Sequence, residues 1–189
     1  MISTPSLILA SGSPRRQELL AYYDIPFTTV VPMVEEVVLA TPALTAQTNA
    51  FLKGEAVFTT HPRHYVLSAD TLVAIDDTIL GKPVDAQDAH RMLRMLSAKT
   101  HQVYTGVALF CPDQAPLQAI ATTEVTFLPL SDAMIEHYIQ TGEPMDKAGA
   151  YGMQSIGNKL VERINGSPSN VIGLPLSVLT TFFQQLHWL

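Results

Sequence analysis

The chain has 189 residues, of which 47% are hydrophobic, and it carries a formal net charge of −6 at pH 7. This length and hydrophobic content are enough for one buried core, so we expect a single domain over residues 1–189. The negative charge argues against a general nucleic-acid-binding protein, because such proteins need a broad basic surface to displace the counterions of phosphate.

Cysteine usage and hydropathy indicate the compartment. Cys111 is the only cysteine, so no intrachain disulfide can form, and we expect it to be a small buried hydrophobe in a reducing cytoplasm. The first residues lack the basic flank and apolar core of a signal peptide, and no stretch approaches the roughly 18 apolar residues of a membrane span. We therefore expect a cytoplasmic protein without a membrane partner.

The first half of the chain alternates between strand and helix patterns. Residues 6–10 are an apolar run, and Ser13-Pro14 followed by RRQELLAYY predicts the start of a helix. The patterns that follow predict a strand at 27–34, a helix at 45–60, a buried strand at 65–75, a turn at Asp76-Asp77 and an amphipathic helix at 85–98.

The second half continues the alternation. Two long strands are predicted at 101–111 and 117–130, joined by PDQAP and paired antiparallel. They are followed by a helix at 132–142, a glycine-rich segment, a strand and turn at 159–166, and a C-terminal helix that begins at Pro175. The alternation predicts an α/β domain with a mixed sheet.

Two adjacent arginines, Arg15 and Arg16, fall in the first turn of the first predicted helix, where their charge opposes the helix dipole. A solvated surface tolerates such a misfit at a cost of about a few tenths of a kcal/mol. Alternatively, the free backbone N–H groups, the serine hydroxyls and the two guanidinium groups form a cradle for a phosphate. The residues alone leave both interpretations open.

Asp70 interrupts the apolar run VLSADTLVAI, where a carboxylate needs a cation or several hydrogen-bond donors. It is either a structural ion-pair partner or a metal ligand or general base. Of Glu35 and Glu36, only one can face the same side as Asp70, because strand residues alternate faces, and adjacent glutamates are otherwise simply solvated. Lys82, in ILGKP, is either a surface lysine or a functional cation.

The common nucleotide and zinc motifs are missing from the sequence. It holds no Walker phosphate-binding loop, no G-x-G-x-x-G and no H-E-x-x-H, and His61 and His64 lack the further ligands that a zinc site needs. The chemistry that remains is carboxylates and basic side chains. That combination suits a hard divalent cation, Mg²⁺ or Mn²⁺, with a phosphate-bearing substrate.

Several stretches give the chain a family resemblance. They are LASGSPRRQELL, the pair EE at 35–36, SADTLV, GKP, HQVYTGVAL, DKAGAYGMQSIG and INGSPSNVIGLPL. In this order they resemble the Maf family of nucleoside triphosphate pyrophosphatases, nearly end to end.

The resemblance implies an elongated mixed sheet flanked by helices, with two lobes around a substrate cleft, related in fold to the inosine triphosphate pyrophosphatases, and a homodimer. It implies hydrolysis of a nucleoside triphosphate to the monophosphate and pyrophosphate, a house-cleaning role in the nucleotide pool. The segment DKAGAYGMQ resembles the branch that acts on dTTP and UTP, including modified uridine triphosphates. The alternatives are a pyrophosphatase for another modified nucleotide such as 7-methyl-GTP, or a nucleotide-binding regulator of cell division.

The resemblance also implies roles for single residues. Asp70 matches the catalytic base and, with Glu36, the metal-binding carboxylates. The implied substrate-binding residues are Ser11, Arg15, Arg16, Thr71, Lys82 and Gln154, of which Arg15, Thr71 and Gln154 match positions associated with substrate choice.

One position departs from the family pattern. The family usually has a lysine directly before an alanine in the helix after the glutamate pair, but here that dipeptide is Glu55-Ala56. The nearest lysine is Lys53, which a small shift of the alignment would move into the role. The sequence leaves this point open.

Overall fold

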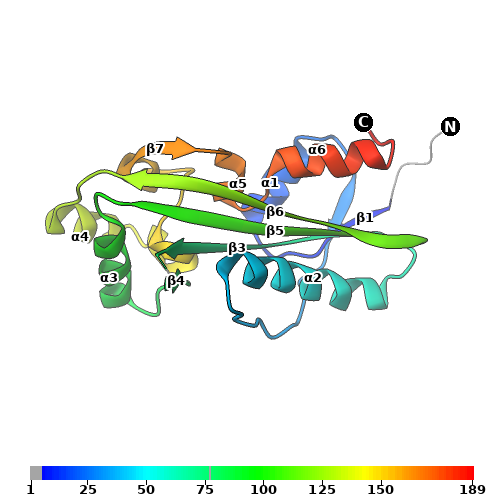
Figure 1. The fold of residues 1–189 in the computed structure, drawn as a ribbon, viewed down its shortest axis with the longest axis horizontal. Coiled ribbons are helices and arrows are strands. Elements are labelled where there is room, and N and C mark those ends of the chain that lie inside the picture. Colours follow the sequence, from blue (N-terminus) through cyan, green and yellow to red (C-terminus); the bar gives the residue numbers. More distant parts are fainter. Residues whose placement is uncertain (1–5, 77) are drawn as a thin grey trace. The chain divides into compact units, whose positions relative to one another are not determined.

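The computed structural model describes residues 6–76 and 78–189, which form a mixed α/β fold (Figure 1). The strands are β1 (Leu7–Leu9), β2 (Phe27–Thr29), β3 (Tyr65–Ile75), β4 (Thr78–Leu80), β5 (Thr100–Cys111), β6 (Gln114–Phe127) and β7 (Val161–Asn165). The α-helices are α1 (Pro14–Ala21), α2 (Pro42–Thr60), α3 (Ala86–Leu96), α4 (Asp132–Gln140), α5 (Pro168–Ile172) and α6 (Leu176–Gln185). Short 3-10 turns are η1 (Glu143–Asp146), η2 (Ala148–Ala150) and η3 (Ile156–Leu160).

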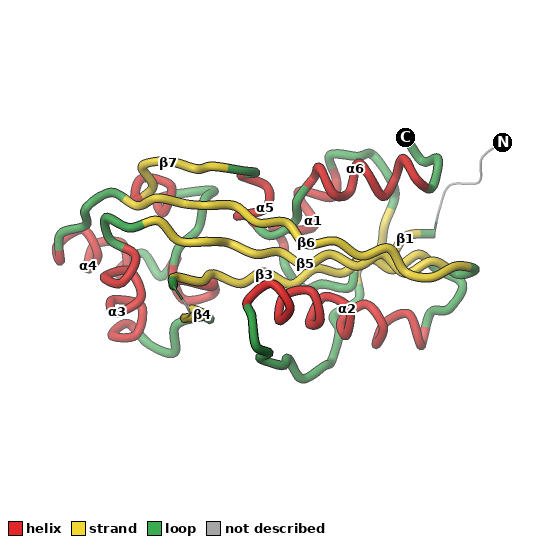
Figure 2. Tube along the Cα trace, viewed as in Figure 1, coloured by secondary structure: helices red, strands yellow, loops and turns green. Residues whose placement is uncertain are grey.

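The described strands form one seven-stranded sheet in the order β2-β1-β3-β5-β6-β7, with β4 paired to β3 (Figure 2). Strand β1 pairs in parallel with both β2 and β3, whereas β4 and β7 pair antiparallel with β3 and β6. Strands β5 and β6 are neighbours joined by the two-residue turn 112–113, a connection that only antiparallel strands can make. The expected mixed sheet flanked by helices is confirmed.

The chain divides into two compact units. The first holds the described residues up to Asp70, Thr105–Ala121 and Gly173–Leu189, and the second holds Thr71–Tyr104 and Thr122–Ile172. Strands β3, β5 and β6 contribute residues to both units.

Each unit has its own apolar core. In the first unit, α2 and α6 lie on opposite sides of the strands (Figure 1), and Val57 of α2 packs with Val66 and Phe110 of the sheet. In the second unit, Leu93 and Leu96 of the amphipathic α3 pack with Phe127 and Ile135. Burial of such apolar side chains is the main favourable contribution to folding.

The boundaries of some elements differ from those that the sequence predicts. The strand expected at 27–34 ends at Thr29, and the next residues are irregular, because Pro32 has no N–H for a sheet ladder. Helix α2 begins earlier than expected, at Pro42, since the Thr41 hydroxyl caps it by accepting from the Leu44 N–H. Strand β6 begins and ends three residues before the predicted 117–130.

Several local features also bear on the sequence predictions. Cys111 is buried, as expected. Ser13 is the N-cap of α1 and Pro14 its first residue, as predicted, although the Ser13 side chain makes no capping hydrogen bond. Of the predicted turn at 76–77, Asp76 has a left-handed φ of 51°, and Asp77 lies outside the described residues. Among the helices that the structure describes, none combines the length and apolarity needed to cross a membrane.

Candidate functional site

Helix α2 lies unusually close to the sheet of the first unit, because two glycines leave room for it. A Cβ atom at Gly106 of β5 would collide with the backbone of Ala46 in α2. A Cβ atom at Gly54 of α2 would lie 2.5 Å from the Phe110 ring and 2.6 Å from the Ser68 hydroxyl. The close approach brings the residue before Gly54, Lys53, to the end of the first unit's part of β3.

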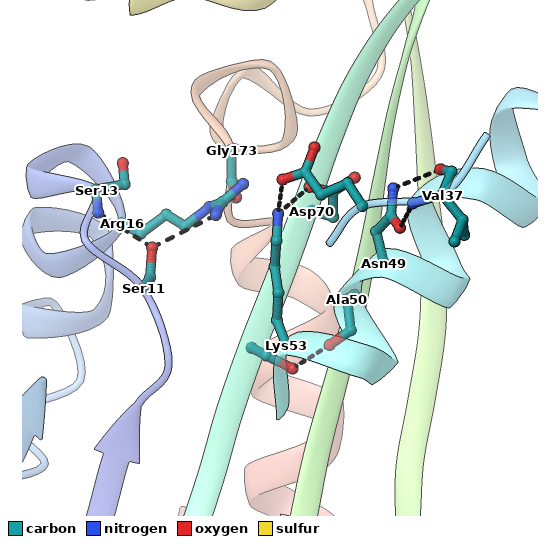
Figure 3. A network of polar contacts seen from close by, with 11 residues as sticks. Ser11, Ser13, Arg16, Val37, Asn49, Ala50, Lys53, Asp70 and Gly173 are labelled. Atoms are coloured by element: carbon teal, nitrogen blue, oxygen red, sulfur yellow. Dashed lines mark hydrogen bonds and ion pairs between the residues drawn. The ribbon is translucent and has the colours of Figure 1, made fainter. Parts of the chain in front are cut away.

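Lys53 connects two carboxylates there (Figure 3). Its Nζ lies 2.5 Å from Asp70 Oδ1 and 2.6 Å from Glu36 Oε1. The side chains of Lys53 and Asp70 are only 13% and 7% exposed, whereas that of Glu36 is 56% exposed. The buried carboxylate that the sequence marked as needing a cation therefore has one, from α2.

The second oxygen of Asp70 has no such partner. Asp70 Oδ2 is buried, and no hydrogen bond within the protein reaches it. A buried carboxylate oxygen without a donor is costly, since it has lost its water and gained nothing in return. A ligand or a water that donates a proton to this atom would satisfy it.

Arg16 projects from the first turn of α1 beside this cluster (Figure 3). Its Nε donates to the carbonyl oxygen of Gly173 at 2.9 Å and its Nη1 to the Ser11 hydroxyl at 3.4 Å. Ser11 is buried, and its hydroxyl oxygen also accepts from the Ser13 N–H at 3.1 Å. Ser11 and Arg16 are thus brought together by the loop before α1, as the cradle interpretation requires.

The charges of the cluster explain how paired arginines are tolerated at this helix end. Desolvation lowers the pKa of Arg16, and Arg15 lowers it further, while the carboxylates of Asp70 and Glu36 act in the opposite direction. An arginine stays protonated despite such a shift. Asp70 and Glu36 are therefore the carboxylates that stabilise the charge of Arg16.

A divalent cation fits part of this arrangement. The described residues contain no group of three or more His, Cys, Asp and Glu side chains arranged to hold a metal. Glu36 and Asp70 nevertheless share one ammonium group, and Asp70 Oδ2 lacks a donor. Mg²⁺ is often held by only one or two carboxylates, with waters and substrate phosphates completing the coordination.

The remaining predicted site residues belong to the second unit. Thr71 follows Asp70 directly, and Lys82 is exposed in the loop after β4. The neighbouring Gly81 accepts a hydrogen bond at 3.0 Å from the N–H of Gly149. The GKP and DKAGAYG stretches therefore lie side by side in this unit.

The loop that carries Gln154 is fastened by Glu143. The Glu143 carboxylate accepts from the Tyr138 hydroxyl at 3.0 Å and from the N–H groups of Ile156 and Gly157 at 3.3 Å. The Tyr138 hydroxyl accepts in turn from the Gly152 N–H at 3.1 Å. Gln154 is exposed midway between these anchors.

The structure thus brings Ser11, Arg16, Glu36 and Asp70 together in the first unit, with Arg15 adjacent in α1, and places Thr71, Lys82 and Gln154 in the second. The sequence left Lys53 open, and the structure puts Lys53, not Glu55, against the two carboxylates. Glu55 is exposed. A signal was present, since a buried aspartate needs a cation and Lys53 lies in the helix before its strand.

Comparison with known proteins agrees with the resemblance. The family described as "Maf-like protein" matches residues 6–186. A dTTP/UTP pyrophosphatase of Bacillus cytotoxicus is 48% identical over 94% of each chain, and one of Symbiobacterium thermophilum is 50% identical over 90% of this chain and 88% of the relative.

Solved structures share the fold at low identity. The Ham1 protein of Staphylococcus aureus superposes with a TM-score of 0.59 at 13% identity, covering 95% of this chain and 98% of that one. A HAM1 protein of Coxiella burnetii gives 0.55 at 16% identity over 96% and 99%. With the match to almost its whole length, the chain belongs to the Maf-like protein family.

Proposed function

We propose that the protein hydrolyses dTTP and UTP, and modified uridine triphosphates, to the monophosphate and pyrophosphate. The observation that carries the proposal is the contact of Lys53 with both Glu36 and Asp70, beside Arg16. Such a cluster offers cations for phosphates and a carboxylate for proton transfer. The substrate class is supported by the relatives, which are named dTTP/UTP pyrophosphatases.

Asp70 is the proposed general base. Lys53 holds its Oδ1, which leaves the buried Oδ2 to accept a proton from the water that attacks the α-phosphorus. The attack forms a bond from the water oxygen to phosphorus and breaks the bond to the bridging oxygen, so that pyrophosphate leaves. Because Lys53 fixes the carboxylate, Oδ2 needs little rearrangement to act.

The negative charge of the triphosphate repels an attacking water until part of that charge is neutralised. A divalent cation, Mg²⁺ or Mn²⁺, held by Glu36 and Asp70 would neutralise part of this negative charge. Arg15, Arg16 and Lys82 are the proposed phosphate-binding side chains, and the Ser11 hydroxyl, which accepts from Ser13 and Arg16, has its own proton to donate. Charge that develops on the leaving group is stabilised by these donors.

Arg15, Thr71 and Gln154 are the residues proposed to select the nucleobase of the substrate. A side-chain amide carries both donors and an acceptor, so Gln154 can pair with the polar edge of a pyrimidine. A wrong base would leave a buried polar group unpaired at a cost of about 1–3 kcal/mol, which is enough for clear selection. Replacing Arg15 with alanine should shift substrate preference more than stability, because this half-buried charged side chain is proposed to contact the substrate.

The decisive experiment measures pyrophosphate release from a nucleotide panel in the presence of Mg²⁺ or Mn²⁺. We expect the highest kcat/KM for dTTP, UTP and 5-substituted uridine triphosphates. A preference for 7-methyl-GTP, or release of inorganic phosphate in place of pyrophosphate, would refute the proposed reaction.

A second experiment separates an enzyme from a nucleotide-binding regulator. Asp70→Asn should abolish turnover while nucleotide binding, measured by calorimetry, persists. Asp113→Asn, at the exposed turn between β5 and β6, is the matched control and should keep full activity. Turnover at the normal rate in Asp70→Asn would contradict the base assignment.

The setting of the enzyme is also proposed. The single cysteine and the acidic charge support a cytoplasmic protein that acts on free nucleotides and does not bind nucleic acid. The family resemblance supports a homodimer. Sedimentation equilibrium of the purified protein tests the dimer, and a single species of about 20.6 kDa would contradict it.

A further inference from the structure

A buried amide on α2 holds the backbone next to Glu36. The Oδ1 atom of Asn49 accepts from the Val37 N–H at 2.9 Å, and its Nδ2 donates to the Val37 carbonyl oxygen at 3.0 Å (Figure 3). Asn49 is only 2% exposed. One side chain therefore satisfies both backbone groups of one residue, as a neighbouring strand would do.

The segment around Val37 has no regular structure of its own. Residues 30–39 form neither helix nor strand, and Glu35, Glu36, Val38 and Leu39 are exposed. A second bond from the same helix ends the stretch, since the Thr45 hydroxyl oxygen accepts from the Leu39 N–H at 3.0 Å. The position of this segment thus depends on side chains of α2 where a sheet ladder would otherwise act.

The same helix supplies the partner of Glu36. Asn49 and Lys53 are four residues apart, so they lie on one face of α2. Asn49 sets where the backbone after Glu36 runs, and Lys53 lies 2.6 Å from the Glu36 carboxylate. Two side chains about one turn apart on α2 therefore determine how far the Glu36 carboxylate lies from the Lys53 ammonium group.

We propose that Asn49 is a positioning residue of the site, which acts by holding Val37 so that the Glu36 carboxylate reaches Lys53 and stays beside Asp70. The side chain does not touch a reacting group. The kinetic part of the proposal rests on the proposed function, whereas the structural part does not.

The structural part is tested by hydrogen exchange of the full-length protein. Asn49→Leu keeps a side chain of similar size on a buried helix face and removes both hydrogen bonds. We expect the Val37 amide to exchange at least about tenfold faster, the factor that corresponds to one lost hydrogen bond. Asn170→Leu is the matched control, because Asn170 is another fully buried amide, which donates to Val103 and Thr123 in the second unit.

The kinetic part is tested by a double-mutant cycle with Glu36→Gln. We expect Asn49→Leu to lower kcat/KM for UTP by about tenfold, and the double variant to be no worse than Glu36→Gln within about twofold. A residue that only supports the fold would lower kcat/KM by the same factor in both backgrounds. Asn49→Asp, which keeps the acceptor for Val37 N–H but turns an oxygen toward the Val37 carbonyl, provides a second variant if Asn49→Leu does not fold.

The outcomes separate the two proposals. Unchanged exchange at Val37 overturns the positioning role, and so do losses that multiply in the double variant. Equal acceleration at Val37 in Asn170→Leu also overturns it, because the effect would then reflect global loosening. If the wild type releases no pyrophosphate from any nucleotide, the proposed function fails, and the exchange result alone decides whether Asn49 holds Val37.

Discussion

Lys53 and Asp70 form a buried ion pair across 17 residues of sequence, with Lys53 Nζ 2.5 Å from Asp70 Oδ1. The same nitrogen lies 2.6 Å from Glu36 Oε1. Because one ammonium group serves two carboxylates, the three side chains form one electrostatic unit. A change at any of them alters the charge environment of the other two.

Removal of the ammonium is the first prediction. Lys53→Met leaves the buried Asp70 carboxylate without its cation, which should lower the free energy of unfolding by about 3 kcal/mol. It also removes positive charge beside the proposed base, so kcat for pyrophosphate release should fall by about 100-fold or more. Urea unfolding and steady-state kinetics measure the two effects.

Two further substitutions test whether Lys53, rather than position 55, is the functional position on α2. Lys53→Arg keeps the charge and should retain more of the stability than of the activity, since a guanidinium cannot take the place of a compact ammonium between two carboxylates. Glu55→Gln, at the exposed position on the same helix, should change neither property by more than about twofold. A loss in Glu55→Gln as large as that in Lys53→Met would disprove the assignment.

The second prediction concerns the glycine beside Lys53. Gly54→Ala should gain about 1 kcal/mol of helix propensity. The new methyl group would collide with Phe110 and with Ser68, whose hydroxyl donates to Ala50 at 2.6 Å, and overpacking of this kind costs about 1–3 kcal/mol. We therefore expect a net loss of stability in urea unfolding. Gly81→Ala, where a Cβ meets nothing within 4 Å, is the control and should unfold like the wild type.

Local sequence patterns are sufficient to predict several elements, including α1 and β3, which carry Arg16 and Asp70. The Ser13-Pro14 start of α1, the apolar run of β3 and the amphipathic pattern of α3 each depend on neighbouring residues, and all three are confirmed. The strand expected at 27–34 is wrong after Thr29, because the apolar, β-branched run there includes Pro32, which has no N–H for a sheet ladder. A local pattern does not show whether a neighbouring strand is available.

Contacts between residues far apart in the chain could not be predicted from the local sequence patterns. The bonds of Asn49 to Val37 and of Lys53 to Glu36 depend on how closely α2 approaches the sheet. That approach is set by Gly54 and Gly106, which meet different partners far along the chain. The buried Asp70 predicted that some cation must be present, but only the packing of α2 selects Lys53 over the other basic residues.

The third prediction tests the anchor of the Gln154 loop. Burial alone would raise the pKa of Glu143, but hydrogen bonds from Ser155, Tyr138 and Gly157 outweigh burial and lower it. The ionised carboxylate therefore adds stability above its unfolded pKa, and this stability is lost as the pH falls through the lower folded pKa. Glu143→Gln should cost about 1–3 kcal/mol near pH 7, because the amide group places donors against backbone N–H groups.

Hydrogen exchange locates that effect. In Glu143→Gln the amides of Ile156 and Gly157 should lose protection, whereas those of α6, in the first unit, should not. Glu124→Gln is the matched control, since Glu124 is exposed and accepts a hydrogen bond at 3.0 Å from the Asn165 side chain on the neighbouring strand β7. Protection at Gly157 that survives in Glu143→Gln would show that the carboxylate does not hold the loop.

A buried histidine gives the protein a pH-dependent stability. His101 of β5 is fully buried, and its Nε2 lies 2.8 Å from the Tyr151 hydroxyl, while its ring packs edge to face with Phe127. Desolvation lowers the pKa of His101 from 6.5 to about 4. The folded protein therefore keeps this ring neutral at pH values where the unfolded chain would protonate it.

The fourth prediction follows from the sign of that shift. Above pH 6.5 the ring is neutral in both states, so stability is unaffected; between pH 6.5 and 4 the unfolded state binds the proton more tightly, so stability falls as the pH falls. A shift of this size corresponds to about 3 kcal/mol across the window. In urea unfolding, His101→Gln should be less stable than the wild type at pH 7, and its free energy of unfolding should fall less between pH 6.5 and 4. His137→Gln, at an exposed position, should keep the pH dependence of the wild type. An unchanged slope in His101→Gln would assign the pH dependence to other groups.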